Sequence, residues 1–187
     1  MQPGKGTIRE GLINAARSLF YQHGYLHTTL AEVAQTAAVP IGNIYYYFKT
    51  KDSLLEAVIA EYQRQVEGDC ARLDHIADPR ERLRAFFAID GTTARQVARF
   101  GCPYGTLCQE LAKLESPLAE SAQHLLQSQI AWVARQLTSL GKGDTAHDLA
   151  TSLIALQQGW YLMATTFPGS EALMHHLKQL DLWLAAV

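Results

Sequence analysis

The residues best suited to chemistry in this chain are the polar and aromatic side chains between positions 40 and 51. Asn43 carries an amide that can read the edge of a base, and Lys51 carries a cation that suits a phosphate. The hydroxyl groups of Tyr45, Tyr46 and Tyr47 can also reach phosphates. Because successive residues of a helix turn by about 100°, the three rings cannot share one face. At least one is exposed, so we expect a surface that contacts nucleic acid.

Two short helices joined by a turn must position these side chains. Thr29 followed by Glu32 forms a capping-box pattern, which predicts the start of the first helix. Pro40 ends that helical pattern and suits the start of a second helix. The second helix leaves Ile44 and Phe48 to face the core. This pattern is typical of a helix-turn-helix, and double-stranded DNA is the first partner to consider.

A preceding helix and an uneven charge complete a small basic head. Apolar residues recur at helical spacing from Thr7 for about four turns, and Gly24 is a natural stop. Residues 1–51 carry five basic and two acidic side chains, a net charge of +3, whereas the remainder carries 11 basic and 16 acidic ones, a net charge of −5. We predict a DNA-binding domain over 1–50 and a helical effector-binding and dimerisation domain over 51–187.

The composition favours an all-α protein of about nine helices. The chain has 187 residues, 48% of them hydrophobic and 18% charged, which is typical of a globular protein. Helix caps and spacings of three and four recur, and few segments alternate as strands do. Body helices are expected over about 50–77, from 78 towards the break at 101, and over 106–114, 117–140, 145–167 and 170–186. The helix over 145–167 is apolar on almost all of its faces, so it must be buried on more than one side. A homodimer packed through the last two helices would bury it.

The composition also argues against several other classes of protein. The start of the chain has no apolar leader, and the uncharged run 149–170 has glutamines and a glycine at its centre, so no membrane contact is expected. Three cysteines without disulfide spacing fit a cytoplasmic protein. The pairs His147-Asp148 and His175-His176 could suggest a metal site, but no third ligand has suitable spacing. No catalytic arrangement or cofactor motif is present, so an enzyme is not expected. A helical enzyme or protein-interaction module without DNA binding is the alternative of another class.

Several segments of the first third carry a resemblance to a known family. They are Ile8 to Phe20, Gly24-Tyr25, Thr28-Thr29, Val33-Ala34, Ala37 to Val39, Gly42 to Phe48 and Lys51 to Leu55. In these segments the chain resembles the TetR family of bacterial transcriptional regulators. The resemblance implies a dimer whose paired recognition helices enter successive major grooves of a palindromic operator. It also implies a ligand cavity in each body, and a repressor that a small-molecule effector releases from DNA.

The resemblance also assigns roles to residues of the head. It implies that Thr28 or Thr29 and Lys51 lie at phosphates and that Gly42 allows a close backbone approach. The residues it implies along the groove-facing surface are Pro40, Ile41, Asn43, Tyr45, Tyr46 and Tyr47. Two positions depart from the family. Ala38 replaces a usual glycine and is strained if its turn needs a positive φ, and Ile41 replaces a common polar residue but can meet a thymine methyl.

The body offers two hypotheses for what the protein senses. A cavity that holds an unknown small molecule is the first, and aromatic residues with a few polar groups would line it. The candidate lining residues are Phe86, Phe87, Phe100, Cys102, Tyr104, Trp132, Gln157, Trp160 and Tyr161. The alternative is a redox or electrophile sensor that uses Cys102, because backbone amides of its glycine-rich break could stabilise a thiolate. Two buried structural thiols at Cys102 and Cys108 are the simpler interpretation.

Overall fold

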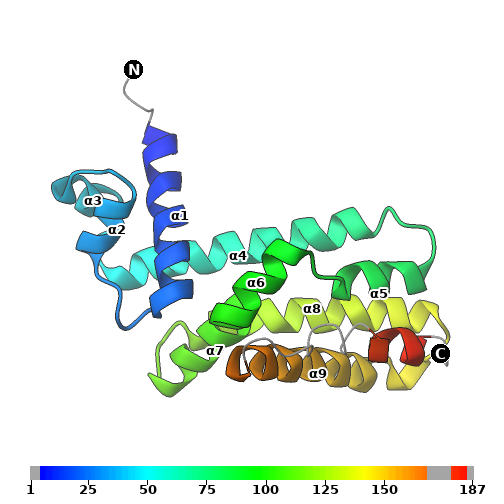
Figure 1. Cartoon of the computed structure of the whole chain (residues 1–187). Coiled ribbons are helices and arrows are strands. Elements are labelled where there is room, and N and C mark those ends of the chain that lie inside the picture. Colours follow the sequence, from blue (N-terminus) through cyan, green and yellow to red (C-terminus); the bar gives the residue numbers. More distant parts are fainter. Residues whose placement is uncertain (1–4, 168–177, 185–187) are drawn as a thin grey trace. The chain divides into compact units, whose positions relative to one another are not determined.

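The computed structural model describes residues 5–167 and 178–184, and all regular structure in these ranges is helical (Figure 1). The predicted all-α fold is confirmed. The chain divides into two compact units, the first made of residues 1–64 and 106–123 and the second of residues 65–105 and 124–187. The predicted boundary after residue 50 therefore falls inside the first unit.

Nine α-helices precede residue 168 among the described residues. They are α1 Lys5–His23, α2 Leu30–Thr36, α3 Ile41–Tyr47, α4 Lys51–Leu73, α5 Pro79–Phe87, α6 Gly91–Phe100, α7 Pro103–Lys113, α8 Ala119–Ser139 and α9 Ala146–Thr166. A short 3-10 helix, Gly143–Thr145, precedes α9, and residues 178–184 are helical. Most of the predicted helix over 170–186 lies outside the described residues. No described helix is both long and apolar enough to cross a membrane.

Three predicted helix boundaries in the body are wrong. The single helix expected from 78 towards 101 is two helices, because the Asp90 carboxylate accepts the N–H groups of Thr92 at 2.7 Å and Thr93 at 2.9 Å and starts α6. These hydrogen bonds, led by that of Thr93, lower the pKa of Asp90. Helix α4 ends at Leu73 rather than near 77, and α7 begins at Pro103 rather than 106. Proline is favoured at a first helical turn, where its missing N–H costs nothing.

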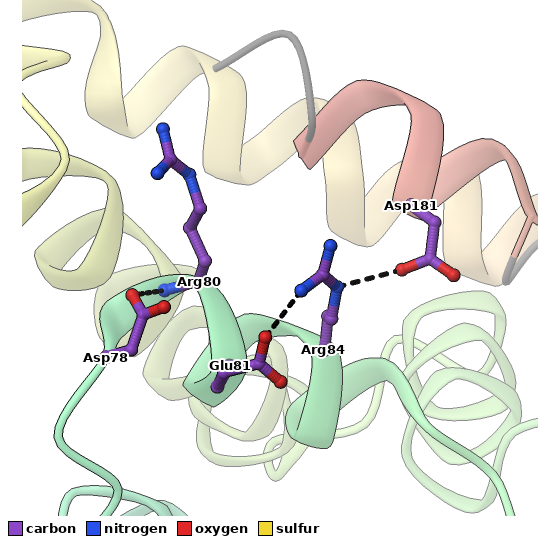
Figure 2. A network of polar contacts seen from close by, with 5 residues as sticks. All are labelled: Asp78, Arg80, Glu81, Arg84 and Asp181. Atoms are coloured by element: carbon purple, nitrogen blue, oxygen red, sulfur yellow. Dashed lines mark hydrogen bonds and ion pairs between the residues drawn. The ribbon is translucent and has the colours of Figure 1, made fainter.

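The predicted helix caps are present as hydrogen bonds. The Glu32 N–H donates to Thr29 Oγ1 at 3.2 Å, and the Thr29 N–H donates to Glu32 Oε2 at 2.7 Å, which completes the capping box. At the start of α5 the Asp78 carboxylate accepts the Arg80 N–H at 2.9 Å (Figure 2). These contacts satisfy amides that a helix start otherwise leaves without partners.

Each unit has its own hydrophobic core. In the first unit α1, α2 and α3 pack together, and their most deeply buried side chains include Leu12, Val33 and Ile44. In the second unit α4, α5, α8 and α9 share a core with the last described segment, which contributes Leu180 and Leu184. At the surface of this unit, Arg84 bridges Glu81 and Asp181, with its Nε 3.0 Å from the latter (Figure 2). Such exposed ion pairs contribute little to stability, so the core holds the unit together.

The turn between α2 and α3 contains a strained alanine. Ala38 has φ of 53°, in the left-handed region that glycine occupies without strain. Its N–H donates to the Gln35 carbonyl at 3.0 Å, and the next N–H, from Val39, donates to the Ala34 carbonyl at 2.9 Å. The left-handed residue thus closes the end of α2 and sends the chain into α3. The strain predicted for this position is confirmed.

Replacement of Ala38 by glycine is expected to raise the free energy of unfolding by about 1 kcal/mol, because it removes the left-handed strain. Urea denaturation followed by circular dichroism measures the change. The control is Ala37→Gly at a φ of −78°, which is expected to lower stability by roughly 0.5–1 kcal/mol. Equal effects of the two substitutions would contradict strain at Ala38.

Candidate DNA-binding surface and ligand cavity

Helix α3 turns most of its polar and aromatic side chains towards solvent. Ile44 is fully buried, whereas Tyr45 and Tyr46 are 48% and 64% exposed. The Tyr46 and Tyr47 rings meet edge to face at 5.1 Å between centroids, so the half-buried Tyr47 supports the exposed ring. The other groove-facing candidates, Pro40, Ile41, Gly42 and Asn43, are all exposed. The predicted exposure of at least one tyrosine is confirmed.

Gly42 is placed where a groove could approach the backbone. No atom lies within 4 Å of the point where its Cβ would be, and its φ does not require glycine. Nothing inside the described structure therefore explains the missing side chain. A close approach from outside, as the sequence predicts, is consistent with this open space.

The loop before α2 is held by Lys51 from the start of α4. The Lys51 ammonium donates to the carbonyl oxygens of Tyr25 at 2.9 Å, Leu26 at 3.2 Å and Thr28 at 3.1 Å. It also lies 4.3 Å from the centre of the Tyr25 ring. An ammonium has three donors, so this arrangement uses all of them within the first unit.

Thr28 also has an internal role. Its side chain is buried, and its Oγ1 donates to the Gly24 carbonyl at 2.8 Å. Of the two threonines assigned to phosphate, the exposed Thr29 is therefore the better placed. The phosphate contacts of Lys51 and of either threonine stay predictions. In the structure, the side chains of Lys51 and Thr28 instead donate hydrogen bonds to backbone carbonyls of the loop before α2.

Sequence reasoning missed the three partners of Tyr25 that complete this loop. The Tyr25 hydroxyl donates to Asp52, and the Tyr25 ring packs edge to face on Phe20. Burial, followed by the hydrogen bond to Asp52, raises the pKa of the Tyr25 hydroxyl, which keeps it protonated. Glu110 of α7 accepts the N–H groups of Tyr25 and Leu26. No local spacing signals a pairing across 85 residues, so the sequence offered no sign of Glu110.

The second unit contains a cavity of about 540 Å³. Five of the nine predicted residues line it, namely Phe86, Cys102, Tyr104, Gln157 and Tyr161. Contact of the other four with a ligand stays a prediction. Phe87 and Trp132 fill the hydrophobic core, where Trp132 Nε1 also donates to Asp74 at 3.0 Å, and Phe100 and Trp160 do not line the cavity.

The cavity is more polar than the sequence predicted. Its wall includes the amide side chains of Gln65, Gln96 and Gln129, together with Thr93. Two of its charged residues, Asp69 and Arg72, pair with each other on the exposed side of α4, and Asp90 caps α6. The polar members lie on helices whose inward faces depend on tertiary packing, so spacing alone did not reveal them.

The cysteines have the environment of structural thiols. Cys102 is buried, and burial raises the pKa of its thiol, an effect that the hydrogen bond from the Gly105 N–H at 3.4 Å only partly offsets. Burial also raises the pKa of Cys70 to about 11. Cys108 is half-buried, and its Sγ donates to the Ala122 carbonyl at 3.1 Å. Because the thiolate is the reactive species, the structure does not favour the redox alternative.

Comparison with known proteins identifies the head. The sequence model described as "Bacterial regulatory proteins, tetR family" matches residues 12–58, which span α1, α2, α3 and the start of α4. The chain belongs to the TetR family. The resemblance noted in the sequence is thereby confirmed.

Relatives of this TetR-family chain extend beyond its head. The HTH-type transcriptional regulator LmrA of Bacillus subtilis (strain 168) is 29% identical over 178 residues, which cover 91% of this chain and 93% of that protein. The HTH-type transcriptional regulator BetI of Paraburkholderia xenovorans (strain LB400) is 40% identical over 82 residues, which cover 43% of this chain and 42% of BetI. The crystal structure of a TetR transcriptional regulator from Legionella pneumophila matches with a TM-score of 0.81 at 19% identity, over 98% and 99% of the two chains. The predicted class, a DNA-binding transcriptional regulator, is confirmed.

The described part of the chain holds no group of three histidine, cysteine, aspartate or glutamate side chains that could bind a metal ion. The pair at 175–176 lies outside the described residues. The relatives are named as transcriptional regulators, which supports regulation by DNA binding. That the chain is not an enzyme stays a prediction supported by these relatives.

Proposed function

We propose that this TetR-family regulator is a repressor that binds a palindromic operator as a homodimer and leaves it when a small molecule occupies the cavity. The observation that carries the DNA-binding part is helix α3. It exposes Asn43, Tyr45 and Tyr46 while Ile44 fixes it to the core. A helix held in this way can enter a major groove without losing its packing.

The proposed contacts divide into readout and positioning. Asn43 reads a base edge, since its amide can bond an adenine in two places. Ile41, 47% exposed, contacts a thymine methyl. The hydroxyls of Tyr45 and Tyr46 position the helix on phosphates, and Thr29 adds a contact from the start of α2.

A homodimer through α9 is supported by apolar side chains that the described residues leave uncovered. Leu156, Leu162 and Met163 are 46%, 66% and 46% exposed on one helix. A monomer rarely leaves such a set in water. A second copy is the proposed cover, because a two-fold axis would give two heads and hence a palindromic site.

The proposed effector is an uncharged small molecule with both aromatic and polar character. Gln157 is buried at the cavity wall, and its amide has both donors and an acceptor to offer a ligand. Phe86, Tyr104 and Tyr161 supply ring surfaces. None of the described residues of the wall is a buried charged side chain that could pair with an ion, and burial of an unpaired charge is costly.

Release is proposed to follow a shift between two body conformations. The effector binds more tightly to the one in which α4 holds the heads at a spacing unsuited to the operator. A hundredfold loss of operator affinity needs roughly 2.7 kcal/mol of preference for that conformation.

Selection of bound fragments from a random duplex pool tests the DNA-binding surface. The wild type is expected to recover palindromic sites, and Asn43→Ala is expected to lose about 1–3 kcal/mol of discrimination at one position of each half-site. Asn14→Ala, the same change at an exposed position of α1, is the matched control and should leave the recovered sequence unchanged. Identical sites from wild type and Asn43→Ala would rule out Asn43 as the base reader.

A release screen on the complex of the wild type with its selected duplex tests the cavity. For compounds that release the wild type, Gln157→Leu is expected to need at least roughly tenfold more compound, since one buried hydrogen bond to the ligand is lost. Its operator affinity should not change. Gln127→Leu, at an exposed position of α8, is the control. Unaltered release of Gln157→Leu by every active compound would place the effector elsewhere.

A further inference from the structure

Glu110 holds the loop between α1 and α2 by its backbone amides. Its Oε2 accepts the Tyr25 N–H at 2.9 Å, and its Oε1 accepts the Leu26 N–H at 2.8 Å. Both are charge-assisted hydrogen bonds, the stronger kind. A Cβ on Gly24 would lie only 3.1 Å from Glu110 Oε1, and Gly24 has φ of +85°. The loop thus leaves room for this carboxylate at the residue where it turns.

Lys51 holds the same loop by its carbonyl oxygens. Glu110 accepts the backbone N–H groups of Tyr25 and Leu26, and Lys51 donates to their backbone carbonyl oxygens. Both backbone polar groups of each residue are therefore held. The loop runs directly into Thr29, the cap of α2. Because α2 packs on α3, a shift of the loop changes the placement of the recognition helix.

Helix α7 connects this contact to the cavity. Pro103 and Tyr104, in its first turn, line the cavity, and Glu110 lies six residues beyond Tyr104 in the same helix. Six residues of α-helix span roughly 9 Å. A continuous helix of this length moves largely as a rigid rod, so a displaced first turn moves the carboxylate as well.

We propose that Glu110 is a positioning residue that couples occupancy of the cavity to the placement of the DNA-binding head, an inference that rests on the proposed function. Glu110 touches neither DNA nor effector in this proposal. It acts through the amides of Tyr25 and Leu26. Because coupling between two binding sites is reciprocal, the proposal predicts that DNA binding at the head alters the first turn of α7. It can therefore be tested before an effector is known.

Glu110→Gln tests the coupling, because an amide keeps one acceptor but turns a donor towards the second N–H. The probe is the duplex selected by the wild type, and the readout is hydrogen exchange of a peptide covering residues 98–107 with and without saturating duplex. The wild type is expected to show a duplex-dependent change. Glu110→Gln should bind about tenfold more weakly, as expected for loss of one charged hydrogen bond, and should lose more than half of that change.

Two further variants make the experiment decisive. Glu120→Gln, the same change at an exposed position of α8, should behave as the wild type does. Glu110→Asp keeps the charge but shortens the side chain, and it should lose the change as Glu110→Gln does, which provides a second test if the glutamine variant does not fold.

The outcomes separate the two proposals. A wild type that binds no duplex overturns the proposed function. A wild type that binds duplex without any change in the 98–107 peptide overturns the coupling alone. So does a full wild-type change in the Glu110 variants at saturating duplex, because a merely structural role would lower affinity and leave the response of the bound state intact.

Discussion

The contact on which the head depends is the Lys51 ammonium among three carbonyl oxygens of the loop before α2. A hydrogen bond to a charged group contributes roughly 1.5–3 kcal/mol, and here three of them converge with a ring contact to Tyr25. The loop precedes the Thr29 cap, and α2 packs on α3. Lys51 therefore fixes the loop that leads into α2, the helix that supports α3. A helix of seven residues such as α3 is not stable without such support.

This use of Lys51 changes the chemistry left for DNA. The exposed face of α3 is neutral, with an amide, hydroxyls and the apolar Ile41 rather than basic groups. Such a face contributes to sequence recognition through base edges and DNA shape more than to electrostatic attraction for the phosphates. Under the proposed function, specificity resides in this short helix and regulation resides in the second unit.

Local rules predicted the local features and failed where distant residues meet. The capping box at Thr29, the strain at Ala38 and the burial of Ile44 follow from a few neighbouring residues, and all are present. The Asp90 cap was equally local and was missed. Glu110 could not be found, since its partners lie 84 and 85 residues away. In the cavity, ring-bearing residues were chosen by type, but Phe87 and Trp132 fill the core because burial depends on the three-dimensional packing of α5 and α8.

The salt dependence of operator affinity in Lys51→Met tests the central role of Lys51 most directly. If Lys51 holds the loop, the variant binds its operator more weakly while the slope of log K against log salt stays that of the wild type. Lys49→Met, at the neighbouring exposed lysine, is the matched control for the loss of one charge. A slope reduced by about 0.9 in Lys51→Met, with its unfolding free energy unchanged, would instead make Lys51 a phosphate contact and contradict the account.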